Sequence, residues 1–145
     1  MRTLVLAVLA LTACTGGSRL KMATGTVTSD QEVRAIMRRA LESDASGQAA
    51  DTLYTGGATI AANGRARLSA PRFAGIGRGG LLSIQALSAE MAPPFAWGTV
   101  RYQSAARDGS NAVTGVATFI LQQGDQGWRI VHVHSSLAVP GEAIR

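Results

Sequence analysis

The stretch Gly127–Ser136, which reads GWRIVHVHSS, constrains the fold more than any other part of this chain. Large β-forming residues recur in it with a period of two, which is the pattern of a strand in a sheet. Regular alternation would give one face Trp128, Ile130, His132 and His134, and the other face Arg129, Val131, Val133 and Ser135. The first face combines an aromatic ring, an aliphatic side chain and two titratable rings. We therefore expect it to line a ligand pocket.

The length and composition indicate one globular domain. The chain has 145 residues, of which 46% are hydrophobic and 16% are charged, enough to bury a sizeable core. Its net charge of +5 comes almost entirely from arginine, since Lys21 is the only lysine. The arginines are scattered along the chain and only seven residues are Phe, Trp or Tyr, so the sequence shows neither a basic stripe nor a stacking platform. We expect no nucleic-acid partner.

The N-terminus has the pattern of a secretory signal peptide over residues 1–13. A basic start at Arg2 precedes the apolar run Leu4–Leu11, which is too short to span a bilayer. The following Leu11-Thr12-Ala13-Cys14 resembles a bacterial lipobox, in which the thiol accepts a lipid. Cys14 is the only cysteine, so it cannot form an internal disulfide. The alternative is an ordinary signal peptide with an incidental cysteine. We expect lipidation at Cys14.

Residues 14–28 show no hydrophobic period and are expected to form a flexible tether between the lipid and the domain. These features predict a lipid-anchored protein of the cell envelope. Thr15, rather than Asp, follows the cysteine. In a Gram-negative host this resembles lipoproteins sorted to the outer membrane, facing the periplasm.

The domain proper is expected over residues 29–136, with a loose tail over 137–145. Ser29 and Glu32 form a capping-box pattern, followed by an apolar stripe at helical spacing: Val33, Ile36, Met37, Ala40 and Leu41. This pattern predicts a helix over about 30–43, with a second short helix over 48–53. Asn63-Gly64 predicts a tight hairpin turn between strands at 58–62 and 65–68.

Four longer strands are expected over residues 81–91, 95–106, 111–123 and 127–136, because turn residues separate these segments. Their short connections predict an antiparallel meander. The order of elements therefore indicates an α+β fold, with helices packed on one face of a sheet. Trp97 and Tyr102 are separated by an odd number of positions, so they should lie on opposite faces of their strand.

The helix-first order, Leu53-Tyr54 and above all Gly127–Ser136 resemble the SnoaL-like branch of the nuclear transport factor 2-like superfamily, which has a cystatin-like fold. The resemblance covers about residues 28–136. It implies a cone, in which a strongly curved antiparallel sheet wraps around the N-terminal helix. Many members carry a third helix where this chain has the glycine-rich segment 69–80, which we expect to be a loop at the pocket mouth. The implied pocket residues are Trp97, Trp128, Ile130, His132 and His134.

The superfamily includes ligand binders, isomerases and dehydratases, so activity must be argued from residues. Isomerase chemistry of the ketosteroid type needs a carboxylate base and a hydrogen-bond donor for the oxyanion. The candidates are Asp44, Tyr54 and His132, although no spacing matches the isomerase pattern residue by residue. We therefore expect a small-ligand-binding or protein-interaction module, with an isomerase or dehydratase as the alternative.

His132 and His134 could reach one metal ion, but the sequence signals no third ligand, so no metal and no cofactor are expected. Gly75, Gly77 and Gly80 resemble a nucleotide loop but follow no strand-then-helix unit. A small apolar ligand and a homodimer formed through the outer sheet face are the expected partners besides the membrane.

Overall fold

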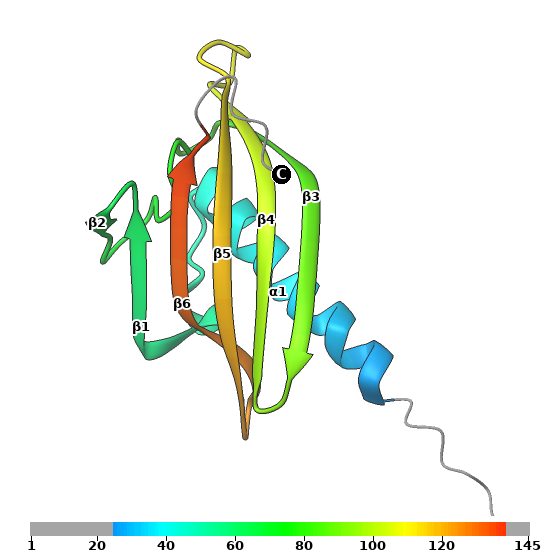
Figure 1. The fold of residues 1–145 in the computed structure, drawn as a ribbon. Helices are drawn as coiled ribbons and strands as arrows, with labels where there is room; N and C mark the ends of the chain where they lie inside the picture. Colours follow the sequence, from blue (N-terminus) through cyan, green and yellow to red (C-terminus); the bar gives the residue numbers. More distant parts are fainter. Residues whose placement is uncertain (1–24, 139–145) are drawn as a thin grey trace, which may run out of the picture.

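The computed structural model describes residues 25–138 and shows one helix packed against a single curved sheet (Figure 1). The elements are α1 (Gly25–Ser46), a 3-10 turn η1 (Asp51–Leu53), β1 (Tyr54–Ala62), β2 (Arg65–Ala66), β3 (Leu81–Ala92), β4 (Phe95–Ala105), β5 (Val113–Gly124) and β6 (Gly127–Leu137). The expected signal peptide, Cys14 and most of the expected tether lie outside the described residues, as does most of the expected tail. No helix among residues 25–138 is long and apolar enough to cross a membrane.

The six strands have the order β2-β1-β6-β5-β4-β3, and α1 crosses one face of the sheet (Figure 1). The predicted α+β cone is confirmed, and β3 to β6 form the predicted antiparallel meander. The expectation of an entirely antiparallel sheet is wrong, because β1 pairs with β6 in parallel. β1 runs in the same direction as the last strand, so the sheet is mixed.

The helix α1 is longer than the expected 30–43 and begins at Gly25, so Ser29 lies inside it and is not its N-cap. The predicted stripe forms the helix's contact with the sheet, since Val33, Met37, Ala40 and Leu41 are all almost completely buried. The helix ends at Gly47, whose φ of 73° is left-handed. There the amides of Gly47 and Gln48 donate hydrogen bonds to the carbonyls of Asp44 and Ser43, respectively, which is the Schellman motif.

The predicted second helix over 48–53 is wrong, because only the single 3-10 turn Asp51–Leu53 forms after that stop. The predicted hairpin turn is confirmed. Asn63 and Gly64 both have positive φ, as a two-residue turn between β1 and β2 requires. Gly64 adopts this conformation without a side-chain penalty.

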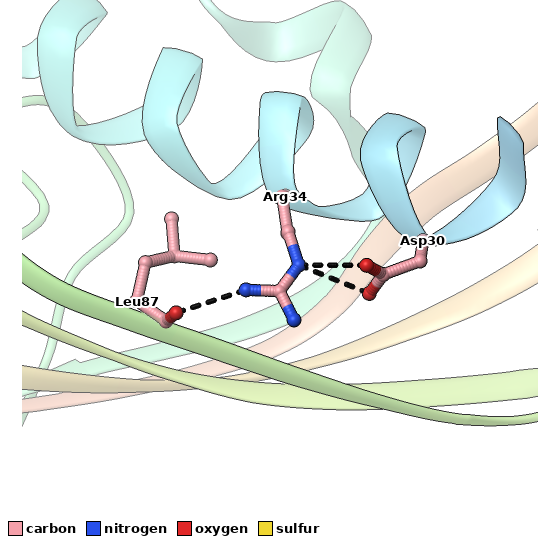
Figure 2. A network of polar contacts seen from close by, with 3 residues as sticks. All are labelled: Asp30, Arg34 and Leu87. Atoms are coloured by element: carbon pink, nitrogen blue, oxygen red, sulfur yellow. Dashed lines mark hydrogen bonds and ion pairs between the residues drawn. The ribbon is translucent and has the colours of Figure 1, made fainter. Parts of the chain in front are cut away.

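The side chain of Arg34 joins α1 to the free edge of the sheet (Figure 2). Its Nε bonds to the carboxylate of Asp30 one turn earlier, and its guanidinium donates a hydrogen bond of 2.9 Å to the carbonyl of Leu87 in β3. This contact covers one of the backbone acceptors that an edge strand leaves exposed.

Candidate functional site

The last strand changes face at Val131. Ile120 of β5 pairs with His132 and Leu121 pairs with Ile130, so Val131 is an extra residue without a partner in β5. Such a bulge reverses the alternation of every residue that follows. Trp128 and Ile130 are buried against the helix, and after the bulge Val133 and Ser135 take the buried positions. The expectation that His132 and His134 share a face with Trp128 is therefore wrong.

The predicted pocket residues consequently separate into two groups. Trp128 and Ile130 lie in the interior of the cone, whereas His134 is exposed and His132 is half-buried on the outer face of the sheet. Trp97 also lies on the outer face and is 43% exposed, while Tyr102 is fully buried, which confirms their predicted placement on opposite faces. Only two of the five residues thus face the place where the superfamily has its pocket.

Side chains occupy the interior of the cone. Met37 of α1 and Phe119 and Leu121 of β5 are fully buried, and Trp128 is 4% exposed. They belong to one continuous core that joins the helix to strands β1, β4, β5 and β6. A substrate of steroid size would have to displace these side chains, because close-packed interiors leave no comparable space.

The segment Arg72–Ile76, here called the plug, closes the mouth of the cone. It belongs to the glycine-rich loop that was expected at this position, and no helix forms there. Phe73, Ala74 and Ile76 are all at most 4% exposed, and the ring of Phe73 lies 5.6 Å from the ring of Phe119. The plug therefore extends the hydrophobic core into the position of the expected pocket entrance.

Asp44, the first catalytic candidate, holds the plug in place. One oxygen of its carboxylate, Oδ2, accepts hydrogen bonds from the backbone amides of Arg72 and, at 2.9 Å, Phe73. Burial raises the pKa of Asp44, although these amides and the charges of Arg72 and Arg78 oppose the increase. A carboxylate used in this way clamps a loop and does not face an open cavity.

Two hydroxyl groups bond to the plug from the sheet. Tyr102 of β4 donates a hydrogen bond of 2.6 Å to the carbonyl of Ala74, and the Oγ of Ser135 accepts one of 3.0 Å from the amide of Ala74. The hydroxyl of Ser135 also donates a hydrogen bond to the carbonyl of Ala61 in β1. Both polar groups of Ala74 are thus paired in the interior, as buried backbone requires.

Tyr54, the second catalytic candidate, lies beside this network. Its hydroxyl is buried and has no hydrogen-bond partner in the described structure, and burial raises the pKa of this phenol. The guanidinium of Arg72 lies 4.9 Å from the centre of the ring and also bonds to Asp51. Asp44 and Tyr54 therefore converge at the plug, whereas His132, the third candidate, lies on the other side of the sheet.

No pattern in the sequence indicates that Arg72, Tyr102 and Ser135 act together. The spacing places Tyr102 opposite Trp97, and regular alternation places Ser135 opposite Trp128, but neither pattern predicts a contact with residues 72–76. The one available signal was the interruption of glycines by the apolar residues Phe73 and Ile76. Among residues 25–138 no group of three or more His, Cys, Asp or Glu side chains is placed to hold a metal ion.

The helix, the mixed sheet and the closed cone define a cystatin-like α+β domain. The chain belongs to the family of SnoaL-like domains, whose model matches residues 56–140. A search of curated protein sequences found no match.

Similar folds occur among solved structures. A nuclear transport factor 2-like superfamily protein from Salmonella enterica has a TM-score of 0.63 and 22% identity, covering 83% of this chain and 98% of that one. An NTF2-like protein with a cystatin-like fold from Novosphingobium aromaticivorans has a TM-score of 0.60 and 15% identity, covering 81% and 86%. A candidate ketosteroid isomerase from Shewanella frigidimarina has a TM-score of 0.56 and 14% identity, covering 70% and 92%. At these identities the similarity shows the fold alone.

Proposed function

We propose that this SnoaL-like domain is a lipid-anchored, non-catalytic protein-interaction module of the cell envelope. The observation that carries the proposal is the occupied cone. The plug fills the mouth, and the carboxylate that catalysis would need is engaged by the amides of Arg72 and Phe73. Because side chains and the plug occupy the interior, we take the outer surface as the place of binding.

The outer face of the sheet offers such a surface. Trp97, Ile120 and His132 follow one another across β4, β5 and β6 in direct register. Phe95 adds a second ring on the same face, and Phe95, Trp97 and Ile120 are each about two-fifths exposed. Exposed aromatic side chains in one row are the anchors that protein interfaces favour.

A second copy of the chain is the partner that this row fits. A twofold axis through the face would bring Trp97 and Ile120 of one protomer against the same residues of the other, which is the isologous arrangement of most dimers. Glu90 lies opposite Trp97 on β3, so it would stand at the edge of the interface, beside the apolar pair Trp97 and Ile120. We therefore take the functional unit to be a homodimer tethered by its lipids.

Analytical ultracentrifugation of the detergent-solubilised protein tests this interface. The wild type should sediment as a dimer, and the double variant W97S/I120S as a monomer. Leu68→Ser is the matched control, because Leu68 is 97% exposed but lies in the loop after β2, away from the sheet face. A monomeric wild type, or a double variant that remains dimeric, would refute the interface.

The lipid anchor is tested separately. Cys14→Ser should leave the protein unprocessed or release it from the membrane fraction, while the wild type should incorporate a radiolabelled fatty acid. A Cys14→Ser protein that is processed and fractionates like the wild type would contradict the proposed anchor and the envelope localisation, including an outer-membrane position facing the periplasm.

The isomerase or dehydratase remains a second candidate because one observation favours it. Asp44 has a raised pKa, and the nearby Tyr54 hydroxyl is buried without a partner, which together are the kinds of group that such chemistry uses. His132 would take no part in this reaction, since it lies on the outer face of the sheet. Isomerisation of a β,γ-unsaturated ketosteroid, followed by the absorbance of the conjugated product, tests it. The activity must be lost in both Asp44→Asn and Tyr54→Phe to support catalysis.

A further inference from the structure

A hollow lies at the end of the sheet where β4 finishes, between the glycine-rich loop and the turn after Ala105. Its volume is about 540 Å³, within the range of small-molecule sites. Four glycines of segment 75–80 form one wall, and Ala105, Ala106, Arg107 and Asn111 form the other, with Arg78 at the rim of the loop. The plug separates this hollow from the interior of the cone.

The charged side chains that line the hollow have one sign, although the carboxylate of Asp44 lies close enough to Arg78 for the two charges to interact. Arg78 and Arg107 line it and no carboxylate does. Within the described part of the chain neither arginine forms an ion pair, since the two pairs there join Arg34 to Asp30 and Arg72 to Asp51. The carboxylate of Asp108, next to Arg107, instead accepts hydrogen bonds from the amide and hydroxyl of Ser110. The positive charge of Arg107 is therefore not neutralised by its neighbour.

The loop allows a ligand to approach closely. A side chain at Gly77 would meet nothing within 4 Å, so this position opens onto free space. A Cβ at Gly79 would lie 3.7 Å from Nη2 of Arg107, which places that guanidinium against the loop. Gly79 also has a φ of 75°, a conformation that favours glycine. The loop thus presents backbone and the guanidinium of Arg107, and Arg78 also lines the hollow, with its side chain packed against Gly47 at the end of α1.

The C-terminal end of α1 lies nearby, and free carbonyls there would repel an anion. These carbonyls are engaged, however. Those of Ser43, Asp44 and Ala45 accept hydrogen bonds from the amides of Gln48, Gly47 and Gly79. A neighbouring hollow on the helix side of the loop also contains Arg107, together with Arg38 and one carboxylate, that of Glu42. Only the first hollow is purely cationic.

We propose that this hollow is a binding site for a phosphate ester of a small polar molecule. Two guanidinium groups suit a dianionic phosphate, which accepts paired hydrogen bonds from arginine. The volume exceeds what a phosphate ion alone needs, and the lining contains no aromatic ring on which a base could stack. Asn111 adds an amide that fits a hydroxyl group, so a sugar phosphate matches the lining better than a nucleotide.

The same phosphate chemistry is available from a soluble ester or from a lipid headgroup. The hollows lie at the C-terminal end of α1, and a helix of 22 residues is about 33 Å long. If the chain is anchored through Cys14, as proposed above, the membrane-linked end is the opposite end of that helix. This placement favours the soluble ester.

Calorimetric titration of the detergent-solubilised full-length protein with glucose 6-phosphate tests the proposal, with glucose as the uncharged control. Arg107→Gln and Arg78→Gln should each weaken binding tenfold or more, equivalent to about 1.4 kcal/mol. Gly77→Leu should abolish binding by filling the space without changing a charge. Arg39→Gln removes the same charge from an exposed helix position outside the hollow, and Gly124→Leu adds the same side chain in open space. Both controls should stay within twofold of the wild type.

A second titration uses micelles containing phosphatidate. Binding of phosphatidate but not of glucose 6-phosphate, again lost in Gly77→Leu, would support the phosphate site and assign its ligand to a lipid. Absence of binding in both titrations at millimolar ligand would overturn the proposal. An equal loss in Arg39→Gln and Arg107→Gln would also overturn it, because the attraction would then come from net charge alone. None of these outcomes depends on the dimer or on processing at Cys14.

Discussion

His132 and Trp128 lie on opposite faces of β6, although an even number of positions separates them. The unpaired Val131 between them shifts the pleat by one residue, so the tryptophan packs in the core and the histidine faces outward. The two histidines of this strand, His132 and His134, are thereby separated from Asp44 and Tyr54 by the thickness of the sheet.

The face change predicts how substitutions in β6 affect stability. His132→Ala and His134→Ala should each alter the free energy of unfolding by no more than about 0.5 kcal/mol, because neither side chain belongs to the core. Ile130→Ala should cost about 2–5 kcal/mol, since that side chain is fully buried. Urea denaturation followed by tryptophan fluorescence measures all three. A large loss for His132→Ala with a small one for Ile130→Ala would contradict the bulge.

Two tyrosines provide a matched comparison at the plug. Tyr102→Phe removes the donor to Ala74 and leaves that carbonyl unpaired, so it should cost about 1–3 kcal/mol. Tyr54→Phe removes a buried hydroxyl that has no partner, and should be neutral or stabilising. Thermal unfolding of both variants checks the difference. Equal losses for the two variants would show that the Tyr54 hydroxyl is paired in solution.

Gly115 is required because Tyr102 lies directly against it. A Cβ at Gly115 would fall 2.3 Å from Cζ, 2.5 Å from the hydroxyl oxygen and 2.6 Å from Cε2 of Tyr102. Gly115→Ala should therefore displace the ring and destabilise the domain by about 1–3 kcal/mol. Gly124→Ala, on the same strand with nothing within 4 Å, should have little effect or stabilise slightly. Chemical denaturation of the pair tests this, and equal stabilities would contradict the close contact.

The raised pKa of Asp44 makes its contribution to stability depend on pH. The folded state binds the proton of the Asp44 carboxyl group more tightly than the unfolded state does. Loss of that proton, at a pH above the usual pKa of a carboxyl group, therefore favours unfolding. The stability of the wild type relative to Asp44→Asn should therefore fall as the pH rises from about 4 through the raised pKa. Urea titrations of both proteins at acidic and neutral pH measure the difference. If the stability of the wild type relative to Asp44→Asn instead rises with pH, the hydrogen bonds from the amides of Arg72 and Phe73 outweigh burial and lower the pKa of Asp44.

Local sequence patterns predict the elements whose signals lie within a few residues of one another. The helical stripe around Met37 specified which face of α1 is buried, because side chains three and four apart share a face in any helix. Asn63-Gly64 specified the hairpin, because few residues other than glycine and asparagine tolerate the left-handed backbone of that turn. Alternation between turn residues identified the four long strands.

Only the tertiary structure decided which side of the last strand faces the core. Both alternating sets of β6 contain apolar and polar members, so burial of Val133 and Ser135 is as compatible with the pattern as burial of His132 and His134. The choice depends on pairing with the preceding strand β5, where the bulge at Val131 lies, and with β1, which is distant in sequence. The plug was likewise decided at long range. Asp44, Tyr102 and Ser135 come from three elements, and their bonds to residues 72–74 form only when the sheet has curved around the helix.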